Sequence, residues 1–215
     1  MAGRSAGCRI RNRGASEIML GPFHLRHAIL QTLKAPQDLA RTLVAYNPPA
    51  QARWIGLAVV VILSGCLGIL GGMILHQMTG GTAELAGFNP ITMAAMQAAL
   101  IIYGAGATVV VGRLFNGQGK FLDALLLLTW IEFVLVVMQV VQLVLLLVAP
   151  VTFSIISILL IAVMFYLLVQ FIAALHGFRS LVAVGICVIC TFFASAMLAG
   201  VVLVSLGFVP ATLAN

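Results

Sequence analysis

One acidic residue, Glu132, lies deep inside a long apolar stretch of the sequence. It follows Phe121, where that stretch begins, by eleven residues, so a rise of about 1.5 Å per helical residue places it about 16 Å from the start. An ionised carboxylate is costly at such a depth in a membrane, so Glu132 needs a proton or a hydrogen-bonding partner. Hydroxyl groups at nearly the same depth in other apolar stretches are the expected partners: Ser64, Tyr103, Tyr166 and Thr191.

Further polar side chains share the helix face of Glu132. At about 100° per residue, this face also carries Thr129, Gln139 and Gln142, whereas Asp123 points elsewhere. The pattern predicts a polar stripe turned towards the interior of a helix bundle. Such a stripe either carries protons or a solute, or simply joins helices by hydrogen bonds. We favour packing, because polar stripes often have no other role, and the path stays an alternative.

A glycine-rich segment, residues 112–120, invites comparison with a phosphate-binding loop. That motif requires a glycine five residues before a Gly-Lys pair and Ser or Thr after it, but Leu114 and Phe121 occupy these positions. The segment is therefore a short loop with basic and glycine positions rather than a nucleotide site. Its notable residues are Gly112, Arg113, Gly117, Gly119 and Lys120.

Two cysteines, Cys187 and Cys190, form a C-x-x-C pair inside an apolar stretch. No second Cys or His pair lies nearby in sequence, so small packing residues are a better explanation than a zinc site. The sequence also contains no nucleophile elbow, paired catalytic acids or zinc-protease motif. We therefore expect neither catalysis nor a metal or other cofactor.

The composition explains where these residues must be positioned. Of 215 residues, 63% are hydrophobic and 7% charged, against about 25% charged in soluble domains. Runs of about 20 apolar residues cross a bilayer as helices, because helices satisfy their own backbone amides. Five such runs cover residues 54–75, 93–111, 121–148, 151–175 and 181–206, with Pro150 separating the third from the fourth. The predicted fold class is all-α, a polytopic bundle of five transmembrane helices with an N-terminal amphipathic arm.

All eleven basic residues fall on one side of this predicted membrane domain. Eight precede the first run, two lie in residues 112–120, and Arg179 precedes the last run, whereas residues 76–92, 149–150 and 207–215 contain none. The positive-inside rule therefore predicts a cytoplasmic N-terminus and a non-cytoplasmic C-terminus. The net charge of +6 is a topology signal beside anionic lipid rather than a nucleic-acid surface.

The chain divides into four parts. Residues 1–22 are Arg- and Gly-rich and predicted to be disordered, and residues 207–215 form a short tail after the five-span domain of residues 54–206. Between them, residues 23–53 carry apolar side chains at mostly four-residue spacing, which predicts an interfacial amphipathic helix broken at Pro36. These apolar positions are Leu25, Ile29, Leu33, Leu39 and Leu43.

Small residues at four-residue intervals predict close contacts between helices. These ladders fit a compact bundle or a homo-oligomer equally well. They comprise Ser64, Gly68 and Gly72 in the first run, Gly104, Thr108 and Gly112 in the second, and Ala183, Cys187, Thr191, Ser195 and Ala199 in the fifth.

The glycine-rich turn of residues 112–120, which leads into the aromatic Phe121, resembles the bacterial branch of the Yip (Ypt-interacting protein) domain family. The turn of residues 176–180, His-Gly-Phe-Arg-Ser, is similar to that family too, and the five-span plan matches over roughly Leu33 to Leu206. The resemblance implies a non-enzymatic membrane protein. Eukaryotic members associate with small GTPases and carry an Asp-Leu-Tyr-Gly-Pro motif, but here only Gly21-Pro22-Phe23 resembles it, so GTPase binding does not transfer.

Two functions follow as expectations. The first is a membrane scaffold or organising protein that binds lipids, other membrane proteins or a second copy through its helix faces and arm. The alternative is a small transporter or proton-coupled permease that uses Glu132, although the sequence lacks a repeat or matched broken spans. The Ala-, Gly- and Leu-rich composition and very short loops indicate a bacterial inner membrane.

Overall fold

The computed structural model describes residues 22–80 and 90–205, which form seven helices and no strand. The predicted all-α fold class is confirmed. Five of these helices are long and apolar enough to cross a membrane. The helices are α2 (Pro22–Lys34), α3 (Pro36–Tyr46), α4 (Ala50–Met78), α5 (Pro90–Leu114), α6 (Phe121–Val148), α7 (Pro150–His176) and α8 (Leu181–Ser205).

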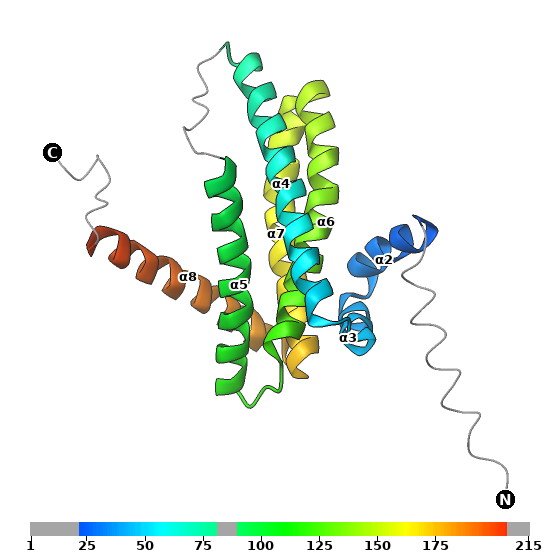
Figure 1. Cartoon of the computed structure of the whole chain (residues 1–215), viewed down its shortest axis with the longest axis vertical. Helices are drawn as coiled ribbons and strands as arrows, with labels where there is room; N and C mark the ends of the chain where they lie inside the picture. Colours follow the sequence, from blue (N-terminus) through cyan, green and yellow to red (C-terminus); the bar gives the residue numbers. More distant parts are fainter. Residues whose placement is uncertain (1–21, 81–89, 206–215) are drawn as a thin grey trace, which may run out of the picture.

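Helices α4, α5, α6 and α7 stand side by side as a bundle, whereas α8 leans away from it (Figure 1). Helix α6 is the centre, because α4, α5 and α7 all pack against it. A helix that is hydrophobic all round can bury several faces at once. Helices α4, α5 and α7 extend beyond their apolar runs, as when α4 starts at Ala50 rather than Trp54, whereas α6 has the predicted bounds. The predicted break at Ala149-Pro150 separates α6 from α7.

Two apolar clusters hold the bundle together, and α6 contributes to both. The first joins α2, α3, α6 and α7, and the second joins α4, α5 and α6. Helix α6 contributes the buried Leu127 to the first cluster and the buried Leu125 to the second. Because these two residues are two positions apart, about 200° around the helix, α6 buries opposite sides.

The N-terminal arm packs on the bundle rather than lying only on a membrane surface. Leu39 and Leu43 of α3 are 1% and 3% exposed, in the same cluster as Leu167 of α7, whereas Leu25 and Leu33 of α2 are 43% and 38% exposed. Helices α6 and α7 cover the apolar face of α3, and the interfacial position of the arm stays a prediction. The predicted break at Pro36 is present between α2 and α3.

Polar contacts fix the docking of the arm. The indole Nε1 of Trp130 in α6 donates a hydrogen bond to Oγ1 of the fully buried Thr32 across 3.0 Å. The amide of Gln37 in α3 donates to Oε1 of Gln170 in α7 across 2.7 Å. The predictions for residues 1–22 and 207–215 fall outside the described residues, apart from Pro22, which begins α2.

Candidate functional site

Glu132 belongs to a small polar cluster that joins three helices inside the bundle. Gln97 of α5 donates from Nε2 to Oγ of Ser64 in α4 across 3.1 Å, and its side chain also interacts with that of Glu132 in α6. Gln97 thus links the hydroxyl and the carboxyl group. Gln97 was absent from the sequence-based candidates, although it is the one amide side chain within residues 93–111.

The other hydroxyls expected beside Glu132 have different partners. Tyr103 and Ser195 share a hydrogen bond of 2.7 Å between α5 and α8, and Thr191 donates to the carbonyl of Cys187 across 2.7 Å. Tyr166 is 48% exposed. Counting along each helix gives a depth but not a direction, so the expected layer of hydroxyls around Glu132 reduces to Ser64.

The polar stripe of α6 divides between two hollows. Glu132 lines the larger one, whereas Gln139 and Gln142 line a cavity of about 280 Å³ beside α4 and α7. Gln142 donates to Ser157 across 2.8 Å, but Oε1 of Gln139 and Oγ1 of Thr129 are buried with no hydrogen-bond partner among the described residues. The stripe is therefore too wide to face one common path.

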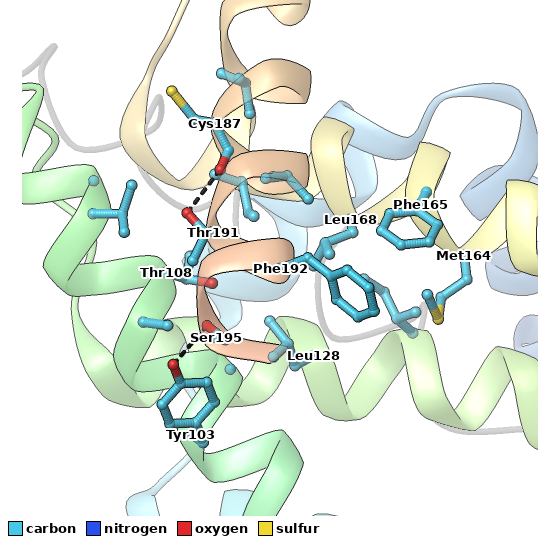
Figure 2. A pocket seen from close by; sticks show the side chains of 18 of the residues that line it. Tyr103, Thr108, Leu128, Met164, Phe165, Leu168, Cys187, Thr191, Phe192 and Ser195 are labelled. Atoms are coloured by element: carbon cyan, nitrogen blue, oxygen red, sulfur yellow. Dashed lines mark hydrogen bonds between the residues drawn. The ribbon is translucent and has the colours of Figure 1, made fainter. Parts of the chain in front are cut away.

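The larger hollow is a cleft of about 1040 Å³ lined by α5, α6, α7 and α8. We call it the α5–α8 cleft, because residues of these two helices line it (Figure 2) and α8 leans away from the bundle (Figure 1). Its walls are mostly aliphatic and aromatic, with Gln97 and Glu132 among the few polar groups. The rings of Phe165 and Phe192 meet edge to face on one side of it, with their centroids 5.7 Å apart. The cleft suits a largely apolar occupant.

The small-residue ladders line this cleft instead of closing it. Gly104, Thr108 and Gly112 face it from α5, and Ala183, Cys187, Thr191 and Ser195 face it from α8. These two ladders therefore do not close on each other along the cleft, and contact with a second copy of the chain stays a prediction. Because small side chains occupy little space, they leave width between the helices where larger ones would fill it.

The ladder residues also differ in their contacts with α6. A Cβ on Gly104 would lie 3.1 Å from Leu128, which is a close approach. A Cβ on Gly68 would meet no atom within 4 Å, because Gly68 and Gly72 line the smaller cavity. The contact of α4 with α6 falls at Gly71 instead, where a Cβ would lie 3.6 Å from Leu143. The close contact predicted for α4 at Gly68 is thus found three residues later, at Gly71.

The glycine-rich turn between α5 and α6 encloses the imidazole of His176, the last residue of α7. A Cβ on Gly112, Gly117 or Gly119 would overlap this ring. The ring is 8% exposed and stacks on Phe178 with the ring centroids 5.4 Å apart. The two turns that resemble the Yip family are therefore one structural unit, in which glycines allow a histidine from the other turn to fit.

The basic residues of these loops lie on the exposed surface of that unit. Arg113, Lys120 and Arg179 are exposed, and together with Arg53 they define what we call the basic end of the bundle. Among residues 22–80 and 90–205, no three His, Cys, Asp or Glu side chains are grouped as metal ligands. Cys190 is exposed and Cys187 half-buried, each as a free thiol.

Five long apolar helices with an intramembrane cleft define a polytopic helical membrane protein. The family model of the Yip1 domain matches residues 30–208, from within α2 to beyond α8, and the chain belongs to the Yip1 domain family. No curated protein and no solved structure matches the chain. The resemblance stated from the two turns is confirmed at the level of the family.

Proposed function

We propose that this chain is a non-enzymatic organising protein of the bacterial inner membrane, from the bacterial branch of the family, which holds another membrane component through its helix faces. The α5–α8 cleft carries the proposal. At about 1040 Å³ it reaches the upper end of the roughly 300–1,000 Å³ that is usual for ligand pockets. Because lipid tails are as apolar as these walls, a membrane partner would be retained by van der Waals packing in the cleft rather than by removal of its surface from water.

The polar groups of the cleft support binding rather than catalysis. Most of its hydroxyls are already engaged, Tyr103 with Ser195 and Thr191 with the carbonyl of Cys187. Among the described cleft residues, no hydroxyl or thiol is hydrogen-bonded to a histidine or carboxylate, the arrangement that activates a nucleophile. These side chains are therefore suited to shape the cleft and to join its helices.

The orientation in this proposal places the basic end in the cytoplasm. Arg53, Arg113, Lys120 and Arg179 all flank spans at that end, in keeping with the positive-inside rule. The arm of α2 and α3 then packs against α6 and α7 within the cytoplasmic half of the membrane, close to anionic lipid.

Purification in mild detergent from native membranes, followed by mass spectrometry, tests the proposal. The wild-type chain should retain a defined protein or lipid component. Thr108→Phe, which places a larger side chain in the cleft, should lose this component, while Val110→Phe, on the same helix but 63% exposed and outside the cleft, should keep it. Recovery of all three chains with the same content would contradict the proposal.

A second candidate is a proton-coupled permease. The Ser64–Gln97–Glu132 cluster favours it, because an acidic group inside a membrane often marks an ion or proton path. Proteoliposomes with an imposed pH gradient separate the two functions. Proton flux that disappears in Glu132→Gln would favour the permease, whereas wild-type flux equal to that of empty liposomes would exclude it.

A further inference from the structure

We propose that the α5–α8 cleft binds one glycerophospholipid from the leaflet at the basic end, with its phosphate beside Arg179 and an acyl chain between α5 and α8. This inference rests on the proposed function and names the class of its ligand. Three features carry it: a cation at the mouth of the cleft, apolar walls behind it, and a crossing of two helices that limits what can enter.

The mouth of the cleft is built by the turn between α7 and α8. Gly177, with φ of 72°, ends α7 in a left-handed conformation, so the chain reverses and places Phe178, Arg179 and Ser180 on the rim of the cleft. Arg179 is exposed and makes no ion pair with a carboxylate in the part of the chain that the structure describes. Its guanidinium is therefore free to bind a phosphate by two parallel hydrogen bonds.

The first turn of α8 adds to this positive end. Oγ of Ser180 accepts a hydrogen bond from the backbone N–H of Ala183 across 3.3 Å, which caps the helix beside Arg179. The N-terminal end of a 25-residue helix carries a partial positive charge. An anion near Arg179 is therefore attracted both by the guanidinium and by the end of the helix. Phospholipid phosphates lie at the depth of a loop between two spans, which matches the position of this turn.

Behind the mouth, the cleft is suited to a hydrocarbon chain. Val111 of α5, Leu168 and Ile172 of α7, and Val184 and Val188 of α8 line it. Their side chains offer no hydrogen bonds, so a polar ligand would lose its hydration without compensation. An acyl chain loses nothing, because its surroundings stay apolar.

The crossing of α5 and α8 favours a lipid chain over a transmembrane helix as the occupant. Tyr103 and Ser195 are joined directly by a hydrogen bond of 2.7 Å, which brings the two helices together at that level (Figure 2). A helix with its side chains is about 10–12 Å wide, so it cannot pass between helices joined in this way. A flexible acyl chain can lie against either side of the crossing.

The test is native mass spectrometry of the full chain after reconstitution in nanodiscs of phosphatidylcholine with a minor fraction of phosphatidylglycerol. The wild-type chain should carry one retained phospholipid, enriched in phosphatidylglycerol. Arg179→Gln should reduce that enrichment about fivefold, as expected for one basic residue near an anionic surface, while Arg41→Gln, an exposed arginine of α3, should not. Thr108→Phe should lower the amount of retained lipid about fivefold, and Val110→Phe should leave that amount unchanged.

Equal lipid retention by Thr108→Phe and Val110→Phe would overturn the inference, since bulk lipid around the bundle would then explain the signal. Unchanged headgroup preference in Arg179→Gln would overturn the assigned phosphate position. If co-purification from native membranes instead shows a protein that only Thr108→Phe loses, the lipid inference fails while the proposed function stands. If neither lipid nor protein is retained, both fail.

Discussion

The guanidinium of Arg53, near the start of α4, donates a hydrogen bond across 2.6 Å to the carboxylate of Asp123, in the first turn of α6. The two side chains are 3% and 15% exposed. Arg53 also donates to the carbonyl of Pro48 at 3.0 Å and to Oδ1 of Asn47 at 2.8 Å. One side chain therefore ties the end of the arm, the first span and the central span together.

Replacing Arg53 by Ala should destabilise the protein by about 3 kcal/mol, because a half-buried Asp123 would lose its counter-charge. Thermal unfolding in detergent measures the effect. Arg41→Ala is the matched control, since its ion pair with Asp38 is 3.5 Å long and the side chains are 62% and 69% exposed. That variant should change the stability by less than about 1 kcal/mol. Equal losses in both variants would contradict a structural role for the Arg53–Asp123 pair.

Gly117→Ala should destabilise the turn between α5 and α6 by about 1–3 kcal/mol, because the added methyl group would overlap the ring of His176. Gly106→Ala is the control, since a Cβ there would meet nothing within 4 Å. A His176→Ala background should remove the part of the cost that comes from the ring, whereas the contact of the added Cβ with the carbonyl oxygen of Gly112, at 2.8 Å, would remain. Additive losses in the double variant would show that the glycine and the histidine do not interact.

Thr32→Val should loosen the arm, because Trp130 would lose the acceptor of its indole N–H at a cost of about 1–3 kcal/mol. Thr42→Val is the control. Like Thr32, Thr42 donates its hydroxyl to the carbonyl four residues earlier, but it is not the acceptor of the Trp130 indole N–H. Tryptophan fluorescence and limited proteolysis of α2 report the release. Indistinguishable spectra for the two variants would argue against arm docking through Trp130.

Gln97→Leu should destabilise the bundle by about 1–3 kcal/mol, because Ser64 and Glu132 would each lose a partner. Glu132→Gln should fold like the wild type, since an amide can still bond to Gln97. Combining Gln97→Leu with Glu132→Leu should cost less than the sum of the single changes, as replacing both members of a polar pair by apolar groups often does. A thermal-shift series in one detergent provides the comparison. If the losses of stability in the two single variants simply add in the double variant, Gln97 and Glu132 are not coupled.

The sequence was sufficient to predict the helices but not the angles between them. Apolar length and Pro150 marked each span, because those constraints act within one helix. The lean of α8 depends on contacts between helices, so the small-residue ladders predicted close contacts without showing that two of these ladders would line a cleft. The partner of Asp123 escaped prediction for the same reason, since Arg53 was assigned only to the topology signal.

The candidate site shows the same division. Glu132 stood out from its depth alone. Depth did not distinguish between its expected partners, Ser64, Tyr103, Tyr166 and Thr191. The structure brings only Ser64 to the cluster, through Gln97. The two turns that marked the family were treated as separate motifs. Their association at His176 required the end of α7 to meet the turn between α5 and α6, which no local pattern encodes.

Photo-crosslinking in native membranes most directly tests the claim that the cleft holds a membrane component. A small diazirine amino acid would replace Thr108, in the cleft, or Val110, on the exposed face of the same helix. Position 108 should yield one defined adduct, and position 110 a diffuse mixture of bulk lipid. The same diffuse mixture at both positions would contradict it.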